Sequence, residues 1–192
     1  MKYLGVLGFV LASTAVCQSV RAETPAAAPP LLPVRIVVPN VASAEAAAAR
    51  DAHLQFERQA MTTLLGWSVA SVATGAMLLA TGGDDYVRGV GLQNVAWGAI
   101  DGVIAGFGYR GIRKQGLLDK PVEHWRAEER KTRKIFLINA GIDVLYVATG
   151  AALWHFGKTD FVRGSGAGVM LQGSFLFVFD SAMGLAPTFT RP

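Results

Sequence analysis

The chain contains one internal repeat, and this repeat limits the folds open to it. Residues 72–89 read VATGAMLLATGGDDYVRG and residues 147–164, which start 75 positions later, read VATGAALWHFGKTDFVRG, with 11 of 18 aligned positions identical. Each copy joins two apolar runs across a turn that contains Gly and Asp, the pattern of two helices joined by a short loop. Two copies in the same direction predict two tandem helical hairpins, related by an approximate two-fold axis.

The composition places these hairpins in a membrane. Hydrophobic residues make up 52% of the 192 positions and charged residues only 17%, with a mean hydropathy of +0.35. Charged residues supply about a quarter of a typical soluble domain. Without Lys2 and Arg21, which belong to a predicted signal segment, 16 basic residues face 14 acidic ones. This imbalance is too small to indicate nucleic acid as a partner, and the expected partner is the lipid bilayer.

The first 22 residues predict a cleavable signal peptide. A lysine precedes an apolar run, and Val20-Arg21-Ala22 offers a small-residue cleavage site. A lipoprotein signal ending at Cys17 is the less favoured alternative, because Val16 stands where a small residue is expected. Cleavage leaves no cysteine, which excludes disulfides and thiolate chemistry. Residues 23–42 are rich in Pro and Ala and predict a flexible tether.

Four membrane spans are expected after the tether, so the predicted fold class is all-α. Residues 43–108 contain a helix, capped by Ser43, and the first hairpin into which this helix leads. Residues 59–83 carry no charged side chain, and this stretch is longer than the 20 or so residues that cross a bilayer. Asp84 or Asp85 caps the second helix. The second hairpin occupies residues 135–186, with Thr159 or Asp160 as the equivalent cap, and residues 187–192 form a tail.

The loop between the hairpins makes the orientation ambiguous. Residues 109–134 form this polar loop, which includes a helix beginning near Pro121 and carries nine basic and four acidic residues. The positive-inside rule places such a loop in the cytoplasm, whereas a cleaved signal places it on the opposite side. Both orientations remain open.

Several polar side chains stand inside the predicted spans. After a four-residue insertion in the second copy, the repeat aligns Gln93 with Gln172 and Asp101 with Asp180, and it places the two acids at a similar depth. Helical spacing places Asn139, Asp143 and Tyr146 on one face of the third span and Asn94 with Asp101 on a face of the second. These six residues form a candidate intramembrane polar site: Asn94, Asp101, Asn139, Asp143, Tyr146 and Asp180.

Two interpretations of this site stay open. Buried carboxyl groups are costly in a membrane and often bind protons or cations, yet they also join helices by hydrogen bonds. In the first span, Ser68 and Ser71 occupy the repeat positions of Asp143 and Tyr146, so a bond from Asp143 to either hydroxyl is expected. Catalysis is the least favoured interpretation.

Glycines and arginines mark possible contact surfaces. Gly98, Gly102 and Gly106 form a small-residue ridge that predicts close helix packing, within the chain or in a homo-oligomer. Arg88 and Arg163 each follow an acid by three positions, so each predicts an i,i+3 ion pair or, alternatively, a contact with anionic lipid headgroups.

Cofactors are not expected. His53 and His124 precede the first and third spans, whereas His155 falls near the end of the third, so no histidine pair suits a haem. No zinc spacing, phosphate loop or nucleophile motif is present in the sequence.

Four strings resemble an uncharacterised bacterial family of four-helix membrane proteins, a domain of unknown function. They are MTTLLGW at 61–67, LQNVAWGAIDGVIAGFG at 92–108, NAGIDVLYVATG at 139–150 and LQGSFLFVFD at 171–180. The resemblance extends over about residues 55–185 and implies the fold without an activity. It also implies that asparagine often stands at the positions of Ser71 and Asp101, which favours hydrogen bonding over titration for Asp101.

Two functions follow from the sequence. The first is a non-enzymatic, multi-pass protein of the bacterial inner membrane that acts as a packing or assembly module. The alternative is a small transporter or proton-coupled carrier that uses its intramembrane carboxyl groups.

Overall fold

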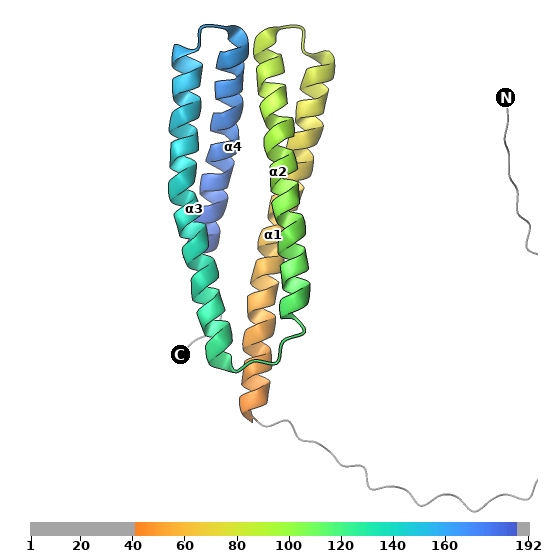
Figure 1. Ribbon diagram of the computed structural model, residues 1–192, viewed down its shortest axis with the longest axis vertical. Helices are drawn as coiled ribbons and strands as arrows, with labels where there is room; N and C mark the ends of the chain where they lie inside the picture. The colour runs from red at the N-terminus through yellow and green to blue at the C-terminus, as the bar shows by residue number, and fades with distance from the viewer. Residues whose placement is uncertain (1–40, 188–192) are drawn as a thin grey trace, which may run out of the picture. The chain divides into compact units, whose positions relative to one another are not determined.

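The computed structural model describes residues 41–187, which form four α-helices (Figure 1). The helices are α1 (Val41–Thr81), α2 (Asp85–Gln115), α3 (Val122–Phe156) and α4 (Asp160–Leu185). The predicted signal peptide lies outside the described residues, as do the tether up to residue 40 and the tail from residue 188.

The helix ends follow from local sequence. The side chain of Asp84 accepts a hydrogen bond of 2.8 Å from the Val87 N–H, and the Thr159 side chain accepts one of 3.3 Å from the Val162 N–H. Of the predicted alternatives, Asp84 and not Asp85 caps α2, and Thr159 and not Asp160 caps α4. The predicted cap at Ser43 is wrong, because α1 already begins at Val41 and Ser43 lies inside its first turn. Pro121 immediately precedes α3, close to the predicted start of that helix.

The four helices pack side by side as two adjacent antiparallel pairs (Figure 1). Helix α1 packs on α2 and α3 packs on α4, each pair being joined by a three-residue turn, at 82–84 and 157–159. The pairs meet through α2 with α4 and through α1 with α3.

Glycines of the repeated segment lie where helices cross. A Cβ on Gly75 would meet the Gly91 carbonyl oxygen at 2.6 Å, and one on Gly150 would meet the Gly166 carbonyl oxygen at 2.7 Å. Gly75 and Gly150 are repeat equivalents, as are Gly91 and Gly166. Close approach of two backbones therefore explains why glycine stands at both copies.

The contact between α2 and α4 is reciprocal. A Cβ on Gly89 would meet the Phe161 carbonyl oxygen, and one on Gly164 would meet that of Tyr86. Phe161 follows Tyr86 by the same 75 positions that separate the two glycines. Equivalent residues thus face each other across this crossing.

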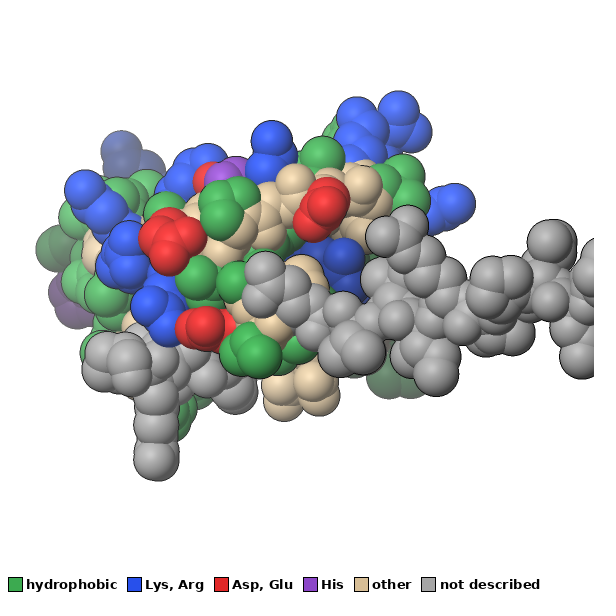
Figure 2. Space-filling model, turned by 90° about the horizontal axis from the view of Figure 1, so that it is seen from below, with side chains coloured by type: hydrophobic (Ala, Val, Ile, Leu, Met, Phe, Trp, Pro, Cys, Tyr) green, Lys and Arg blue, Asp and Glu red, His purple; other side chains and the backbone are tan. Residues whose placement is uncertain are grey.

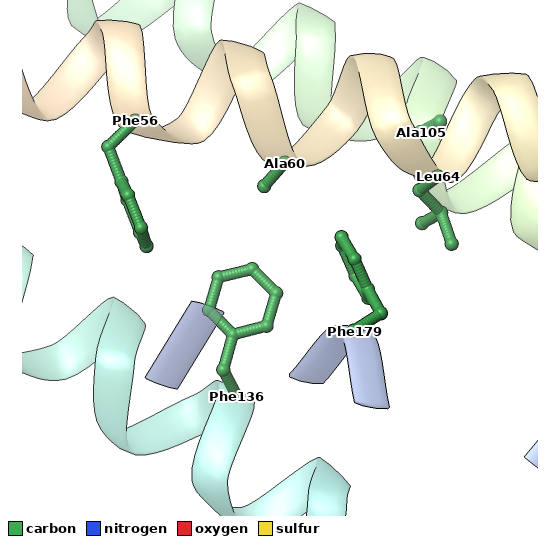
Figure 3. Close-up of a cluster of buried hydrophobic side chains, with 6 residues drawn as sticks. All are labelled: Phe56, Ala60, Leu64, Ala105, Phe136 and Phe179. Carbon is green, nitrogen blue, oxygen red and sulfur yellow. The ribbon is translucent and has the colours of Figure 1, made fainter. Parts of the chain in front are cut away.

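Buried apolar side chains gather in one core cluster between the helices (Figure 3). Helix α1 contributes Phe56, Ala60 and Leu64, which face Phe136 of α3 and Phe179 of α4. The Phe136 ring meets the rings of Phe56 and Phe179 edge to face, with centroids 6.1 and 5.8 Å apart. Such edge-to-face geometry is favourable for aromatic rings, so these three rings join α1, α3 and α4. Ala105 of α2 completes the cluster, which therefore involves all four helices.

A buried ion pair lies below this core. Arg133 of α3 pairs with Glu129 at 2.9 Å and donates hydrogen bonds to the carbonyl oxygens of Ala186 and Pro187, just after α4. The Arg133 guanidinium also lies over the Phe56 ring, 5.2 Å from its centroid. A cation suits the C-terminal end of a helix, where carbonyl groups lack partners.

Three helices, α1, α3 and α4, are long and apolar enough to cross a membrane. Large apolar side chains lie exposed on their outer faces, among them Val69, Leu145 and Val178. Seen from below, the end of the bundle carries Lys and Arg side chains around its edge (Figure 2). Helix α2 is less apolar because glycines, Asn94 and Asp101 interrupt its run.

Candidate intramembrane carboxylate site

A cavity of about 270 Å³ lies within the bundle and receives side chains from all four helices. Five of the six predicted polar site residues line it: Asp101, Asn139, Asp143, Tyr146 and Asp180. The other lining side chains are apolar or aromatic: Met61, Leu64, Trp97, Ile100, Ile104, Phe136, Ile142, Leu176 and Phe179.

The three carboxyl groups are almost fully shielded from solvent. Asp101 of α2 is 2% exposed, Asp143 of α3 is 3% exposed and Asp180 of α4 is 6% exposed. Asp143 and Asp180 come from neighbouring helices and lie close to each other in the cavity. The Oδ2 atoms of Asp101 and Asp143 have no hydrogen-bond partner among the described residues.

Helical rise shows how far two of these acids lie from the basic residues of their helices. Asp101 lies nine residues before Arg110 in α2, and Asp143 lies nine residues after Lys134 in α3. Nine residues of helix rise about 13 Å. Both carboxyl groups therefore lie well inside the bundle, away from its basic end.

Aromatic side chains bound the cavity at both ends. Trp97 of α2 meets Tyr146 of α3 edge to face, with ring centroids 4.8 Å apart, on the side nearer the turns. Phe136 and Phe179 close the side nearer the basic end of the bundle. Along α3, Asp143 lies between Phe136 and Tyr146.

The lining chemistry favours positive charge. None of the described residues that line the cavity is basic, so three acids share it without a cationic partner. The described part of the chain also holds no group of three or more His, Cys, Asp or Glu side chains placed to bind one metal ion. The lining thus offers carboxyl oxygens and aromatic rings, both of which attract positive charge.

Asn94 belongs to a separate network with Gln172 of α4, a residue that the sequence reasoning did not select. Gln172 is fully buried, its Oε1 accepts from Trp67 Nε1 at 2.7 Å, and its Nε2 donates to Asn94 Oδ1 at 2.9 Å and to Ser71 Oγ at 3.2 Å. One amide therefore joins α4 to α1 and α2. A lone Gln in an apolar span was the available signal.

The predicted bond from Asp143 to Ser68 or Ser71 is wrong. Ser68 Oγ donates to the Gly98 carbonyl oxygen at 2.7 Å, and Ser71 Oγ accepts from Gln172. The hydroxyl groups point to α2 and α4, because α1 packs mainly on its own hairpin partner along this segment.

The glycine ridge of α2 is partly used within the chain. A Cβ on Gly98 would meet the Ser68 carbonyl oxygen at 2.9 Å, and one on Gly102 would meet Ser68 Oγ at 2.7 Å, whereas one on Gly106 would meet nothing within 4 Å. Association of copies through Gly98, Gly102 and Gly106 stays a prediction.

The paired arginines differ in their surroundings. Arg88 lies 3.7 Å from Asp85, which is the predicted i,i+3 pair. Arg163 lies in a surface pocket of about 240 Å³ with Tyr86, Trp154, His155 and Asp160. A contact of Arg88 and Arg163 with lipid headgroups stays a prediction.

Fold and cavity together define an all-helical bundle with helices of membrane-spanning length around a buried acidic cavity. The chain belongs to a family of unknown function (DUF6992), whose model matches residues 63–181. No curated protein and no solved structure matches the chain. The predicted resemblance to an uncharacterised domain is confirmed over this range, and a bacterial origin stays a prediction.

Proposed function

We propose that the protein is a small proton-coupled carrier or transporter, not an enzyme, whose bundle binds protons or a cation on Asp101, Asp143 and Asp180. The observation that carries this proposal is the convergence of three buried acids, from three helices, on one cavity without a basic residue among its described lining. Intramembrane carboxyl groups that face a cavity are typical of ion and proton pathways. The geometry thus favours the second of the two functions predicted from the sequence.

The proposal includes four spans, arranged as two tandem repeated hairpins. Helix α2 packs on α1 through Gly75 and Gly91 and on α4 through Gly89, so it accompanies two helices of spanning length. The reciprocal contacts of Gly89 and Gly164 support an approximate two-fold relation between the hairpins. The bacterial inner membrane is the proposed location.

The first test is flux through purified protein in proteoliposomes that contain a pH-sensitive dye. An imposed pH gradient should dissipate faster than in protein-free vesicles, and Asp143→Asn should abolish the difference because asparagine cannot exchange a proton. Asp119→Asn, a change in the exposed loop, is the matched control and should retain the flux. A folded wild-type protein without flux, or an unaltered Asp143→Asn protein, contradicts the proposal.

A packing or assembly module is the second candidate. Gly106 favours it, because this exposed glycine leaves open space on α2 where a second helix could approach. Under this function Gly106→Leu weakens association between copies, measured by cross-linking in membranes. Asp101→Asn, Asp143→Asn and Asp180→Asn would then leave association intact.

A further inference from the structure

The cavity has a mouth, and its position is given by the exposure of the lining residues. Ile100 and Ile104 of α2 are each 50% exposed and Ile142 of α3 is 42% exposed, whereas Leu64 of α1 and Phe179 of α4 are buried. Asn139 of α3 is the polar residue among the exposed lining side chains. The cavity therefore opens between α2 and α3. In a chain whose helices span a membrane, apolar side chains at mid-helix face lipid, so this mouth opens toward the acyl chains.

The mouth and the carboxyl groups impose different requirements on a ligand. A ligand that enters past isoleucine side chains needs an apolar body, because water-coated ions are costly in hydrocarbon. A ligand that pairs with the unpartnered Oδ2 atom of Asp101 and with the neighbouring Asp143 carboxyl group needs a positive charge or N–H donors. An amphiphilic ammonium compound satisfies both requirements.

Two further features agree with an organic cation. The aromatic pair Trp97–Tyr146 bounds the cavity, and aromatic faces attract ammonium groups that have lost their water. The cavity volume of about 270 Å³ is just below the range of about 300–1,000 Å³ usual for drug-sized ligands. The expected ligand is therefore small, with about one ring and one ammonium group.

We infer that the carboxylate cavity binds a small organic ammonium ion that enters from the lipid through the opening between α2 and α3. This inference rests on the proposed function and adds the class of substrate and its route. The ammonium head lies between Asp101 and Asp143, and the apolar body contacts Ile100, Ile104 and Ile142.

The test uses dicyclohexylcarbodiimide, a lipid-soluble reagent that modifies carboxyl groups in apolar surroundings, followed by mass spectrometry of the peptides. Benzyltrimethylammonium is the cationic probe, and neopentylbenzene is its neutral isostere. We expect the reagent to modify Asp101, Asp143 or Asp180. The cation should protect these residues at a concentration about tenfold below the one needed with the isostere, because a desolvated cation–π contact strengthens binding by about that factor.

The outcomes separate the inference from the function on which it rests. Absence of modification at all three acids contradicts the proposed intramembrane carboxyl site itself. Modification without protection by the cation, or with equal protection by the isostere, overturns the ammonium inference while a proton site stands. Benzyltrimethylammonium has no exchangeable proton, so its protection cannot arise from proton buffering.

A pair of variants tests the route. Ile142→Trp places a bulky side chain at the mouth and should slow modification of the acids by the carbodiimide. Ile138→Trp is the matched control, because Ile138 is a similarly exposed residue of α3 outside the lining of the cavity. Equal modification rates in the two variants contradict entry between α2 and α3, and circular dichroism shows that both remain folded.

Discussion

Trp67 of α1 donates a hydrogen bond of 2.7 Å from its indole Nε1 to the Oε1 atom of Gln172 in α4. These residues are 105 positions apart, and the bond connects the first hairpin to the second. The rings of Trp67 and Phe175 stack beside it, with centroids 3.9 Å apart. The bundle is therefore held by a polar junction above its apolar core.

Gln172→Leu should destabilise the bundle by about 2 kcal/mol, because three interhelical hydrogen bonds are lost at about 0.6 kcal/mol each in a membrane. Leucine has nearly the same size, so packing changes little. Gln93→Leu, at the repeat-equivalent position without a side-chain hydrogen bond among the described residues, is the control. Unfolding in mixed detergent micelles measures both, and equal losses would contradict a special role for Gln172.

Gly75→Ala and Gly150→Ala should each destabilise the protein by about 1–3 kcal/mol, since the new methyl group meets the backbone of the neighbouring helix. Gly106→Ala, where a methyl group meets nothing within 4 Å, should instead stabilise it by up to about 1 kcal/mol through helix propensity. Thermal unfolding in detergent tests the three variants, and loss of stability in Gly106→Ala would show an unrecognised contact.

Arg133→Met should cost about 3–5 kcal/mol, because it removes a buried cation that pairs with Glu129 and donates to the Ala186 and Pro187 carbonyl oxygens. The double variant Arg133→Met/Glu129→Met should be less destabilised than the single one, as apolar replacements of a buried pair often are. A double-mutant cycle on unfolding free energies supplies the comparison. If the double variant is the less stable protein, the ion pair is not the source of the effect.

Reporter fusions test the number of spans and the orientation. With four spans, fusions in the loop at 110–134 and at the C-terminus should report one side of the membrane, and a fusion at the 82–84 turn the other side. The same side for the turn and the loop would show that α2 does not cross. A cytoplasmic signal from both the loop and the C-terminus would contradict the predicted cleaved signal.

Much of the site was predictable because it depends on helical periodicity. The spacing of Asn139, Asp143 and Tyr146 places them on one face of α3, and this face lines the cavity. The alignment of Asp101 with Asp180 also brought together two acids that share that cavity. Gln172 was not predicted as a site residue, because nothing local to its helix indicates that Trp67, Ser71 and Asn94 converge on it.

The sequence by itself determined the helices, the caps at Asp84 and Thr159 and the suitability of three helices for a membrane, because caps, turns and apolar runs act within a few residues along the chain. It did not determine every helix end, since α2 continues to Gln115, beyond the predicted end of the first hairpin at residue 108. The tertiary structure alone decided which polar groups meet. Asp143 faces Asp180 and not the hydroxyl groups of Ser68 and Ser71, since the rotation of each helix is set by glycine crossings with its neighbours. Periodicity defines a face of a helix, whereas only packing between helices selects what that face contacts.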